Sequence, residues 1–512
     1  MTTATATATP SRQRRLRPRP VAACIALAFG GAGLAQAQAP AADRLVIRAD
    51  PAARIFPEWR PDLGGLNGGS SNPPGATLPV SSCADDGPGT LRSVVAGAGE
   101  GDIVDLSALT CGVITLTTGA IPVMLNDLDI LGPGADRLGI DGNDTDRLFL
   151  HYGGGRFTLR GLRLLHGADR TTGFHIAGGG CIASAGYLTL DHSVVADCYA
   201  GGEGAYGGAI YAYSLTMISS TLAGNTAYGV LEDTGTAAFG GAAFVYTLDL
   251  TDSTVTGNRA EHRIDPPRTS YDIGGGLMTV FGGRIDRSTI DGNFSFGRAG
   301  GIASFTDLLV SNSTLSGNTA QTEMGGGAFL RLPAALTLAS STVTANVATV
   351  GGGIALSPGG ATFQSSIVFG NRSTTGLAPD LQSTAASAIG GTDNLVGGSG
   401  EGITLPDDTI HGDPMLAPLA FNGGATRTHA LRPGSAAIDR GNNAIASAFD
   451  QRGPDFPRVY GAAADIGAFE LSPQGAVAQT PVPTLSPWML GLLGAGLGAI
   501  AARRRLRTAR AR

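Results

Sequence analysis

The chain has 512 residues with 79 Gly, 15% charged residues and 6% aromatic residues, a composition that favours a repetitive fold over an average globular mixture. All 35 basic residues are Arg, and eleven of them lie in the first 19 and last ten residues. Without those ends, 24 Arg remain against 41 acidic residues, and a net charge near −17 argues against nucleic acid as a partner.

Residues 1–38 have the three-part layout of a secretory signal peptide. An Arg-rich start precedes the apolar stretch Val21–Leu34 and an Ala-x-Ala site at Ala35–Ala37, so we expect cleavage near Ala37 and export by the secretion machinery. An uncleaved membrane anchor is the alternative, although the apolar stretch is short for a span. Residues 39–79 are rich in Pro, Gly and Ser and are predicted to form a linker.

Four cysteines follow the signal peptide, an even number in an exported chain, and disulfides are therefore expected. The preferred pairing joins Cys83 to Cys111 and Cys181 to Cys198, because each pair brackets one local unit. A metal site would need tighter spacing and nearby His, so no metal is assigned to these residues.

Residues 80–175 show short apolar segments separated by Gly turns, and these predict irregular first coils of a stacked β-structure. The segments are Ile114–Leu116, Leu128–Ile130, Leu138–Ile140 and Phe157–Leu159.

Between residues 176 and 400 one unit of the form Ser-Thr-x-x-Gly-Asn recurs seven times at spacings of 25 to 35 residues, each time after a Gly-Gly pair. A minimal unit of about 25 residues predicts one coil of a β-solenoid. Two apolar columns should face inward. Their members are Leu190, Met217, Leu250, Ile285, Val310, Leu338 and Phe363, and Val195, Leu222, Val255, Ile290, Leu315, Val343 and Val368.

The last residue of the unit is an amide, which can both donate and accept hydrogen bonds. We expect these side chains to stack as a ladder at a turn. They are Asn225, Asn258, Asn293, Asn318, Asn346 and Asn371, and Cys198 takes the same position in the first copy. The predicted fold is therefore all-β, a right-handed parallel β-helix.

Residues 401–471 are predicted to form a C-terminal capping module that closes the open end of the β-helix, because solenoid ends need protection. Its charged and polar residues should form a hydrogen-bonded network, and convergence on a pocket or ion is the alternative. They are His429, Asp439, Asp450, Arg452, Asp465 and Glu470.

The region from about Cys83 to Glu470 resembles the choice-of-anchor Q family of secreted proteins. The matching motifs are Cys83–Gly87, Gly89–Arg92, Gly101–Asp105, Gly132–Gly134, Ile140–Asn143, the Ser-Thr-x-x-Gly-Asn repeats, Asn422–His429, Pro433–Ser435, Ala437–Gly441, Asp450–Gly453 and Asp465–Glu470. The resemblance implies a pectin-lyase-like β-helix with a variable surface anchor, and it implies no established reaction.

After a linker at residues 472–482, residues 483–512 resemble the IPTL-type C-terminal sorting tails of Gram-negative proteins, with Val482 where the usual motif has Ile. The resemblance rests on Pro483, Thr484, Leu485 and Trp488, an apolar run to Ala502, and Arg503, Arg504 and Arg505. It implies processing by an exosortase-like enzyme and retention at the cell envelope. Because Trp488 to Ala502 would span only about 22 Å as a helix, a permanent membrane anchor is the less favoured alternative.

Asp252, Asp286 and Arg287 are the weak catalytic candidates, since Asp252 and Arg287 should lie one coil apart on the outer face. A solvated ion pair is the alternative. Asp141–Asp146 is dense in oxygen ligands and suits calcium, the only cofactor considered, but it lacks the Gly and distal Glu of an EF-hand loop and also reads as a polar turn. The favoured function is noncatalytic surface binding of glycans or envelope components. A polysaccharide lyase or glycoside hydrolase is the alternative, and a purely structural role is a third.

Overall fold

The computed structural model describes residues 75–170, 176–230, 238–262, 272–331, 334–357, 360–376 and 379–472. The predicted signal peptide, the predicted linker up to residue 74 and the predicted sorting tail lie outside the described residues. Within the described ranges the regular secondary structure is β-strand, with one helix. No helix in these ranges combines the length and hydropathy needed to cross a bilayer.

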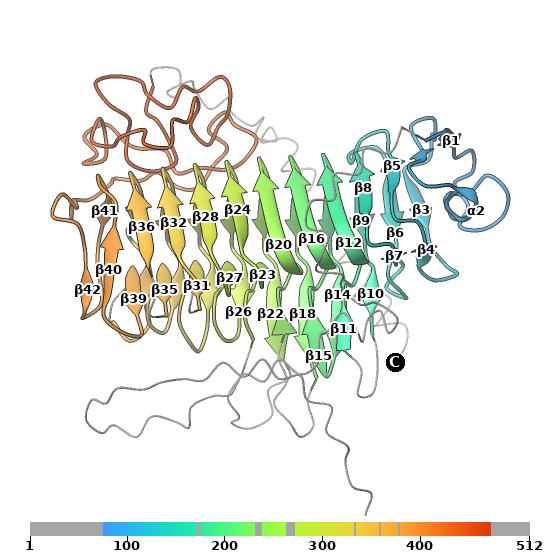
Figure 1. Cartoon of the computed structure of the whole chain (residues 1–512), viewed down its shortest axis with the longest axis horizontal. Helices are drawn as coiled ribbons and strands as arrows, with labels where there is room; N and C mark the ends of the chain where they lie inside the picture. Colours follow the sequence, from blue (N-terminus) through green and yellow to red (C-terminus); the bar gives the residue numbers. More distant parts are fainter. Residues whose placement is uncertain are drawn as a thin grey trace, which may run out of the picture. The chain divides into compact units, whose positions relative to one another are not determined.

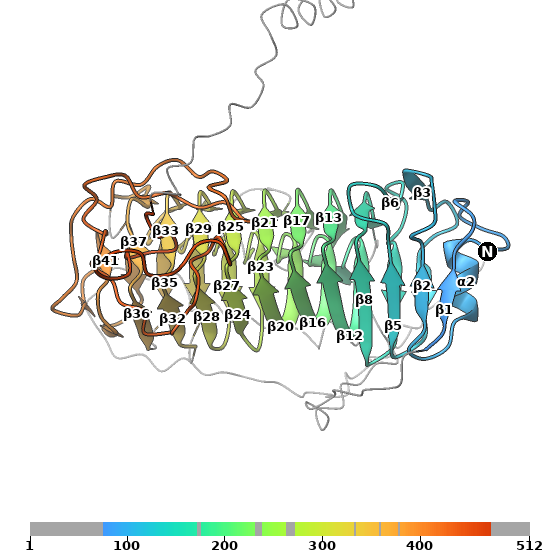
Figure 2. The same ribbon diagram turned by 90° about the horizontal axis from the view of Figure 1, so that it is seen from above.

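The body is a parallel β-solenoid, in which the chain winds repeatedly through three walls (Figures 1 and 2). The named strands pair in parallel with their counterparts one coil earlier and one coil later. Backbone N–H and C=O groups of the central coils are thereby satisfied by the coils on either side. The repeats therefore predicted the solenoid correctly.

The 20-stranded sheet forms the first wall. Its strands are β1 (Thr77–Pro79), β2 (Ile103–Asp105), β4 (Ile121–Val123), β5 (Leu128–Leu131), β7 (Phe149–His151), β8 (Arg156–Arg160), β12 (Ile182–Asp191), β16 (Ile210–Ile218), β20 (Ala243–Thr251), β23 (Leu277–Thr279), β24 (Gly283–Asp286), β27 (Ile302–Ser304), β28 (Leu308–Ser311), β31 (Ala328–Leu330), β32 (Leu336–Ala339), β35 (Ile354–Leu356), β36 (Ala361–Gln364), β39 (Leu381–Ser383), β40 (Ser387–Gly390) and β42 (Ile403–Thr404).

The other walls are an 11-stranded and an 8-stranded sheet, with a small 3-stranded sheet beside them. The 11-stranded sheet contains β3 (Val113–Thr115), β6 (Gly139–Asp141), β9 (Arg163–Leu165), β13 (Val194–Ala196), β17 (Thr221–Ala223), β21 (Thr254–Thr256), β25 (Thr289–Asp291), β29 (Thr314–Ser316), β33 (Thr342–Thr344), β37 (Ile367–Val368) and β41 (Leu395–Val396). The 8-stranded sheet contains β10 (Ala168–Asp169), β14 (Tyr199–Gly202), β18 (Thr226–Gly229), β22 (Arg259–His262), β26 (Phe294–Ser295), β30 (Thr319–Ala320), β34 (Val347–Ala348) and β38 (Arg372–Ser373). The 3-stranded sheet contains β11 (Ile176–Gly178), β15 (Gly204–Tyr206) and β19 (Ala238–Phe239).

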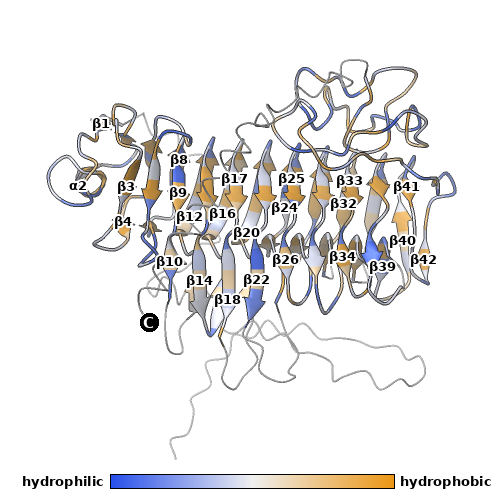
Figure 3. Cartoon of the chain, turned by 180° about the vertical axis from the view of Figure 1, so that it is seen from behind, coloured by the Kyte–Doolittle hydropathy of each residue, from blue (hydrophilic) through white to orange (hydrophobic). Residues whose placement is uncertain are grey.

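Both predicted apolar columns face the interior. The column from Leu190 to Phe363 runs in register across the 20-stranded sheet, and the column from Val195 to Val368 runs across the 11-stranded sheet. All members are at most 1% exposed and belong to one continuous core. The 8-stranded wall contributes small side chains instead, such as the buried Ala227 and Ala260, and its strand β22 is visibly hydrophilic in Figure 3. The predicted coils before residue 175 join the same stack.

The corner between the 20-stranded and 11-stranded sheets has one left-handed residue per coil. Its members have φ between 44° and 51°, and they are His192, Ser219, Asp252, Arg287, Asn312, Ser340 and Ser365. The Ser that follows is buried, and its backbone N–H donates to the Oγ of the equivalent Ser in the next coil at 3.0 to 3.2 Å. This hydroxyl ladder explains why Ser begins each repeat, a role that the repeat pattern alone does not predict.

The predicted Asn ladder lies at the next corner and is confirmed. The side-chain Nδ2 of each Asn donates to the Oδ1 of the Asn one coil later at 2.9 Å, and the same Oδ1 accepts from the backbone N–H. Cys198 N donates to Asn225 at one end, and Asp380 Oδ1 accepts from Asn371 at the other.

Both predicted disulfides are present. Cys83 is bonded to Cys111, and Cys181 is bonded to Cys198 across a separation of 17 residues. The second bridge lies beside the start of the Asn ladder, because Cys198 donates its N–H to the first Asn of that ladder.

One expectation for the N-terminal part is wrong. Residues 77–79 are not linker, because β1 pairs with β2 at the edge of the 20-stranded sheet, where the missing N–H of Pro79 is tolerated. The irregular coils also contain helix α2 (Leu91–Gly97), which Thr90 caps by accepting from Ser93 N. Leu91 and Val95 of this helix are buried against the first coils. The helix has only seven residues, too few to give a periodic apolar pattern in the sequence.

The C-terminal module does not close the end of the solenoid, which corrects the expectation of a terminal cap. It lies along the outer face of the 11-stranded sheet over the later coils (Figures 1 and 2), where Thr314 Oγ1 donates to Gln451 Oε1 at 2.6 Å and Ser316 Oγ lies 2.9 Å from His429 Nε2. The outward hydroxyls of this wall need partners once they are buried, and the module supplies them. The segment that follows the last coil extends the stack, because Ile410 forms a parallel β-bridge with Leu395 of β41.

Candidate ligand-binding face

Four aromatic side chains form a continuous row on the outer face of the 20-stranded sheet, and we call them the aromatic row. They are Tyr187 of β12, Tyr213 of β16, Tyr246 of β20 and Phe281 in the turn before β24. Neighbouring ring centroids are 5.8, 5.7 and 5.6 Å apart along the row. The tyrosine side chains are partly exposed and Phe281 is 52% exposed.

Strand register and a buried aromatic pair, Tyr211 and Phe244, position this row. Strands β12, β16, β20 and β24 lie side by side (Figure 1), so outward residues at equivalent positions approach each other across coils. Phe244 stacks on Tyr211 with centroids 5.7 Å apart and also contacts Tyr246 at 6.0 Å. Tyr211 and Phe244 are almost fully buried, and they give the exposed rings a packed support.

The row was not predicted from the sequence, although a signal was present. Tyr213 and Tyr246 each come six residues after the first Gly of a Gly-Gly pair, at Gly207 and Gly240. Phe281 lies outside a strand, so the alternation rule could not place it.

The candidate catalytic residues Asp252, Asp286 and Arg287 do come together, and we call them the Arg287 cluster. Arg287 binds Asp252 through two hydrogen bonds of 2.9 Å and donates to Asp286 Oδ2 at 2.5 Å. The other carboxylate oxygen of Asp286 accepts from Ser311 Oγ at 2.7 Å. Arg287 and Asp252 occupy the left-handed corner column, which turns their side chains toward each other one coil apart.

The geometry of the Arg287 cluster is that of an ion-pair network. A general acid or base needs a carboxyl group that can exchange its proton with the substrate, but both carboxylates here accept hydrogen bonds from a cation. The pKa of Arg287 is raised, mainly by its hydrogen bonds to Asp252 and also by the charge of Asp286. The carbonyl of Arg287 accepts from Thr426 Oγ1, so the cluster also borders the seam with the C-terminal module.

Further charges follow the aromatic row at the ends of the same strands. Arg284 lies 3.6 Å from Asp286, and the exposed Asp249 is in register with Arg284. The pKa of Asp249 is raised because packed atoms displace solvent, an effect that Arg284 opposes and Asp286 reinforces.

At the N-terminal end of this face, Arg160 lies 3.6 Å from Asp129 and 3.9 Å from Asp191, and His192 is 2.6 Å from Asp191.

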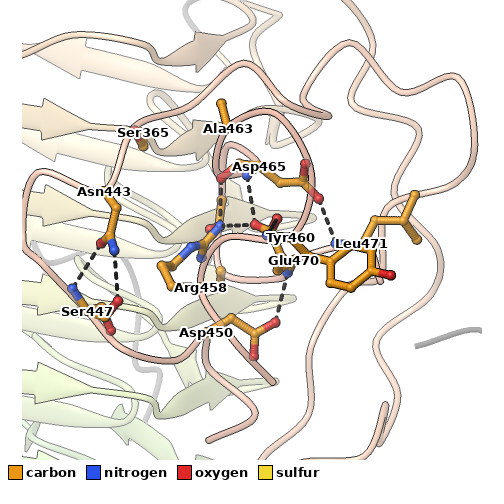
Figure 4. Close-up of polar contacts among 12 residues, drawn as sticks. Ser365, Asn443, Ser447, Asp450, Arg458, Tyr460, Ala463, Asp465, Glu470 and Leu471 are labelled. Atoms are coloured by element: carbon orange, nitrogen blue, oxygen red, sulfur yellow. Dashed lines mark hydrogen bonds and ion pairs between the residues drawn. The ribbon is translucent and has the colours of Figure 1, made fainter. Parts of the chain in front are cut away.

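The charged residues of the C-terminal module form the predicted hydrogen-bonded network (Figure 4). Arg458, fully buried, contacts Glu470 Oε2 at 3.1 Å, and the carboxylate of Glu470 also accepts from the backbone N–H groups of Tyr460 and Asp465. Asp450 binds Arg452 at 2.7 Å and accepts from Glu470 N. Asp439 accepts from Ala462 N and Ala463 N.

His429 instead joins the solenoid through Ser316, and burial lowers its pKa.

The oxygen-rich segment Asp141–Asp146 forms a turn. Asp141 accepts from Asn143 N at 2.7 Å and lies 2.9 Å from His166 Nδ1, and Asp146 accepts from Ala120 N and Arg147 N. The carboxylates of Asp141 and Asp146 therefore already accept hydrogen bonds from groups of the protein. Among the described residues, no group of three His, Cys, Asp or Glu has the arrangement to hold a metal ion.

The sorting residues Pro483, Thr484, Leu485, Trp488 and Arg503 to Arg505 lie outside the described residues. Comparison of the chain with protein-family models, with curated proteins and with solved structures gives no match.

Proposed function

We propose that the protein is an exported cell-surface β-helix protein that binds glycans through the aromatic row and catalyses no reaction on them. The observation that carries the proposal is the row itself, four rings in contact across neighbouring coils on one flat wall. The two disulfides are consistent with an extracellular location.

The physical argument concerns the two kinds of surface on a sugar. A pyranose ring has an apolar C–H face and a polar rim, so a partly exposed aromatic ring can cover the face while hydroxyls bind the rim. The row offers several rings along the direction in which coils stack. Thr189 and Thr216, in register on β12 and β16, offer partly exposed hydroxyls on the same face. A linear glycan lying along the row would contact several coils at once.

We also propose that the solenoid is right-handed and belongs to the choice-of-anchor Q family. Residues 1–38 are removed during secretion in this proposal, and an exosortase-like enzyme cleaves the chain near Pro483. Mass spectrometry of the protein recovered from cells tests both processing steps. A mature N-terminus near residue 38 and loss of the tail are the expected results. An intact tail would instead support a membrane anchor formed by residues 483–512.

The binding test uses the secreted chain on a glycan array, with the Tyr213→Ala/Tyr246→Ala double variant. Aromatic contacts contribute about 0.5–1.5 kcal/mol each, so we expect a loss of about twofold to twelvefold in affinity per ring. Tyr460→Ala is the control, because Tyr460 is a tyrosine that is 48% exposed and belongs to the C-terminal module and not to the row. Equal binding by the double variant and the control would refute a role for the row.

An activity assay separates binding from catalysis. The glycans retained by the protein are incubated with it, and reducing ends and unsaturated products are measured. No product is expected. Product formation that disappears in Arg287→Ala would support a polysaccharide lyase or glycoside hydrolase and contradict the noncatalytic proposal.

A further inference from the structure

The charges that flank the aromatic row indicate which glycans it accepts. We infer, on the basis of the proposed function, that the row binds uncharged linear polysaccharides and discriminates against chains rich in uronic acid or sulfate.

Carboxylates outnumber guanidinium groups along the strand ends next to the row. Among the described residues, the outward side chains at the strand ends that follow the row and in the adjoining corner column comprise five Asp, three Arg and His192, and Arg156 at the start of β8 is outside this count. They are Asp129, Asp191, Asp249, Asp252 and Asp286, and Arg160, Arg284 and Arg287. An anionic sugar on the neighbouring rings would therefore face a net negative border.

None of these three Arg is available to neutralise an anionic sugar without losing a partner. Arg287 is held by two carboxylates at 2.5 to 2.9 Å, Arg284 lies 3.6 Å from Asp286, and Arg160 lies between Asp129 and Asp191. Recruiting one of them would uncover a carboxylate at the same place. Uronate recognition depends on a spare guanidinium or a bridging cation. These three Arg supply no spare guanidinium, and no group of three His, Cys, Asp or Glu among the described residues has the arrangement to hold a metal ion.

Asp249 is the carboxylate best placed to repel an anion. It is exposed on β20, three residues after Tyr246, and has no ion pair shorter than 4 Å with a described residue. The net charge near −17 of the body without its ends adds a long-range repulsion of the same sign.

Arg156 provides the contrasting case. It is in register with Tyr187 at the N-terminal end of the row, is exposed, and forms no ion pair with a described residue. If the ligand were anionic, Arg156 would be the residue to attract it. Arg156→Ala therefore tests directly whether the row binds anionic glycans.

The test measures the affinity of the secreted chain for neutral polysaccharides, β-glucan and xylan, and for polygalacturonate and a sulfated galactan, at low and high salt. At low salt we expect the neutral chains to bind at least about tenfold more tightly than the anionic chains. The affinity for the neutral chains should change little with salt. Asp249→Asn should narrow the ratio between neutral and anionic chains severalfold. Thr362→Ala, at an exposed position on the same sheet, is the control that should leave the ratio unchanged.

The outcomes separate the two proposals. Tighter binding of the anionic chains that is lost in Arg156→Ala, yet still depends on Tyr213 and Tyr246, would overturn the neutral-glycan inference and leave the glycan-binding proposal standing. No binding to either class would overturn the glycan-binding proposal itself. An unchanged ratio in Asp249→Asn would contradict the role given to the acidic border.

Discussion

Replacing one Asn in the middle of the ladder should destabilise the solenoid strongly, and Asn258→Ala is the sharpest case. Asn258 is fully buried. Its Nδ2 donates to Leu222 O at 3.1 Å and to Asn293 Oδ1 at 2.9 Å, while its Oδ1 accepts from the backbone N–H and the Nδ2 of Asn225. Four hydrogen bonds are lost at about 1 kcal/mol each, so the free energy of unfolding should fall by about 4 kcal/mol.

Hydrogen exchange read by mass spectrometry is the suitable assay, because stacked coils need not unfold in one step. Faster exchange is expected in the peptides that contain Asn225, Asn258 and Asn293, and a lower midpoint in denaturant should accompany it. Thr362→Ala, exposed on another wall, is the control. Exchange rates in Asn258→Ala equal to those of the control would refute the view that the ladder stabilises this corner.

Two further predictions concern the Cys181–Cys198 disulfide and Glu470 of the C-terminal module. Removing the bridge in Cys181→Ser/Cys198→Ser should lower the free energy of unfolding by about 3 kcal/mol, measured by denaturant titration under oxidising conditions, and an unchanged midpoint would contradict this. Burial raises the pKa of Glu470 to about 7, against the opposing hydrogen bonds from Asp465 N and Tyr460 N and the charge of Arg458. The folded module then holds a proton that the unfolded chain releases near pH 4.5, so this stability is complete below about pH 4.5 and declines as the pH rises toward 7. Hydrogen exchange of residues 450–470 should show that their protection against exchange falls between about pH 4.5 and pH 7 in the native chain. The fall should be smaller in Glu470→Gln. The same dependence of protection on pH in both proteins would contradict this role of Glu470.

The fold could be predicted because its determinants are local and repeated. Alternation within each copy identifies Leu222 or Val255 as inward, and an amide at the same position in successive copies indicates a ladder. The disulfides were predictable for a related reason, since each joins cysteines within one local unit. The contact between Asp252 and Arg287 followed from a one-coil offset.

What could not be predicted depends on contacts between elements of different kinds. The aromatic row requires the register of coils whose lengths differ, and Phe281 enters it from a turn. The position of the C-terminal module depends on which wall presents hydroxyls, such as Thr314 and Ser316, to its polar groups. Neither feature has a period that one sequence can reveal.

The unequal repeat spacing has a consequence for how such a chain can change. From Gly207, Gly240 and Gly275 to the Ser of the same copy the distance is constant at 13 residues, whereas Asn225 and Asn258 are followed by much longer segments than Asn293 before the next Gly-Gly pair. The longest insertions therefore enter at this edge of the winding, whereas the Gly-to-Ser segment varies only from 13 residues, as after Gly207, to 15 residues, as between Gly326 and Ser341. Loops can lengthen or shorten at this edge while the Ser and Asn ladders keep their hydrogen bonds and the two apolar columns stay packed.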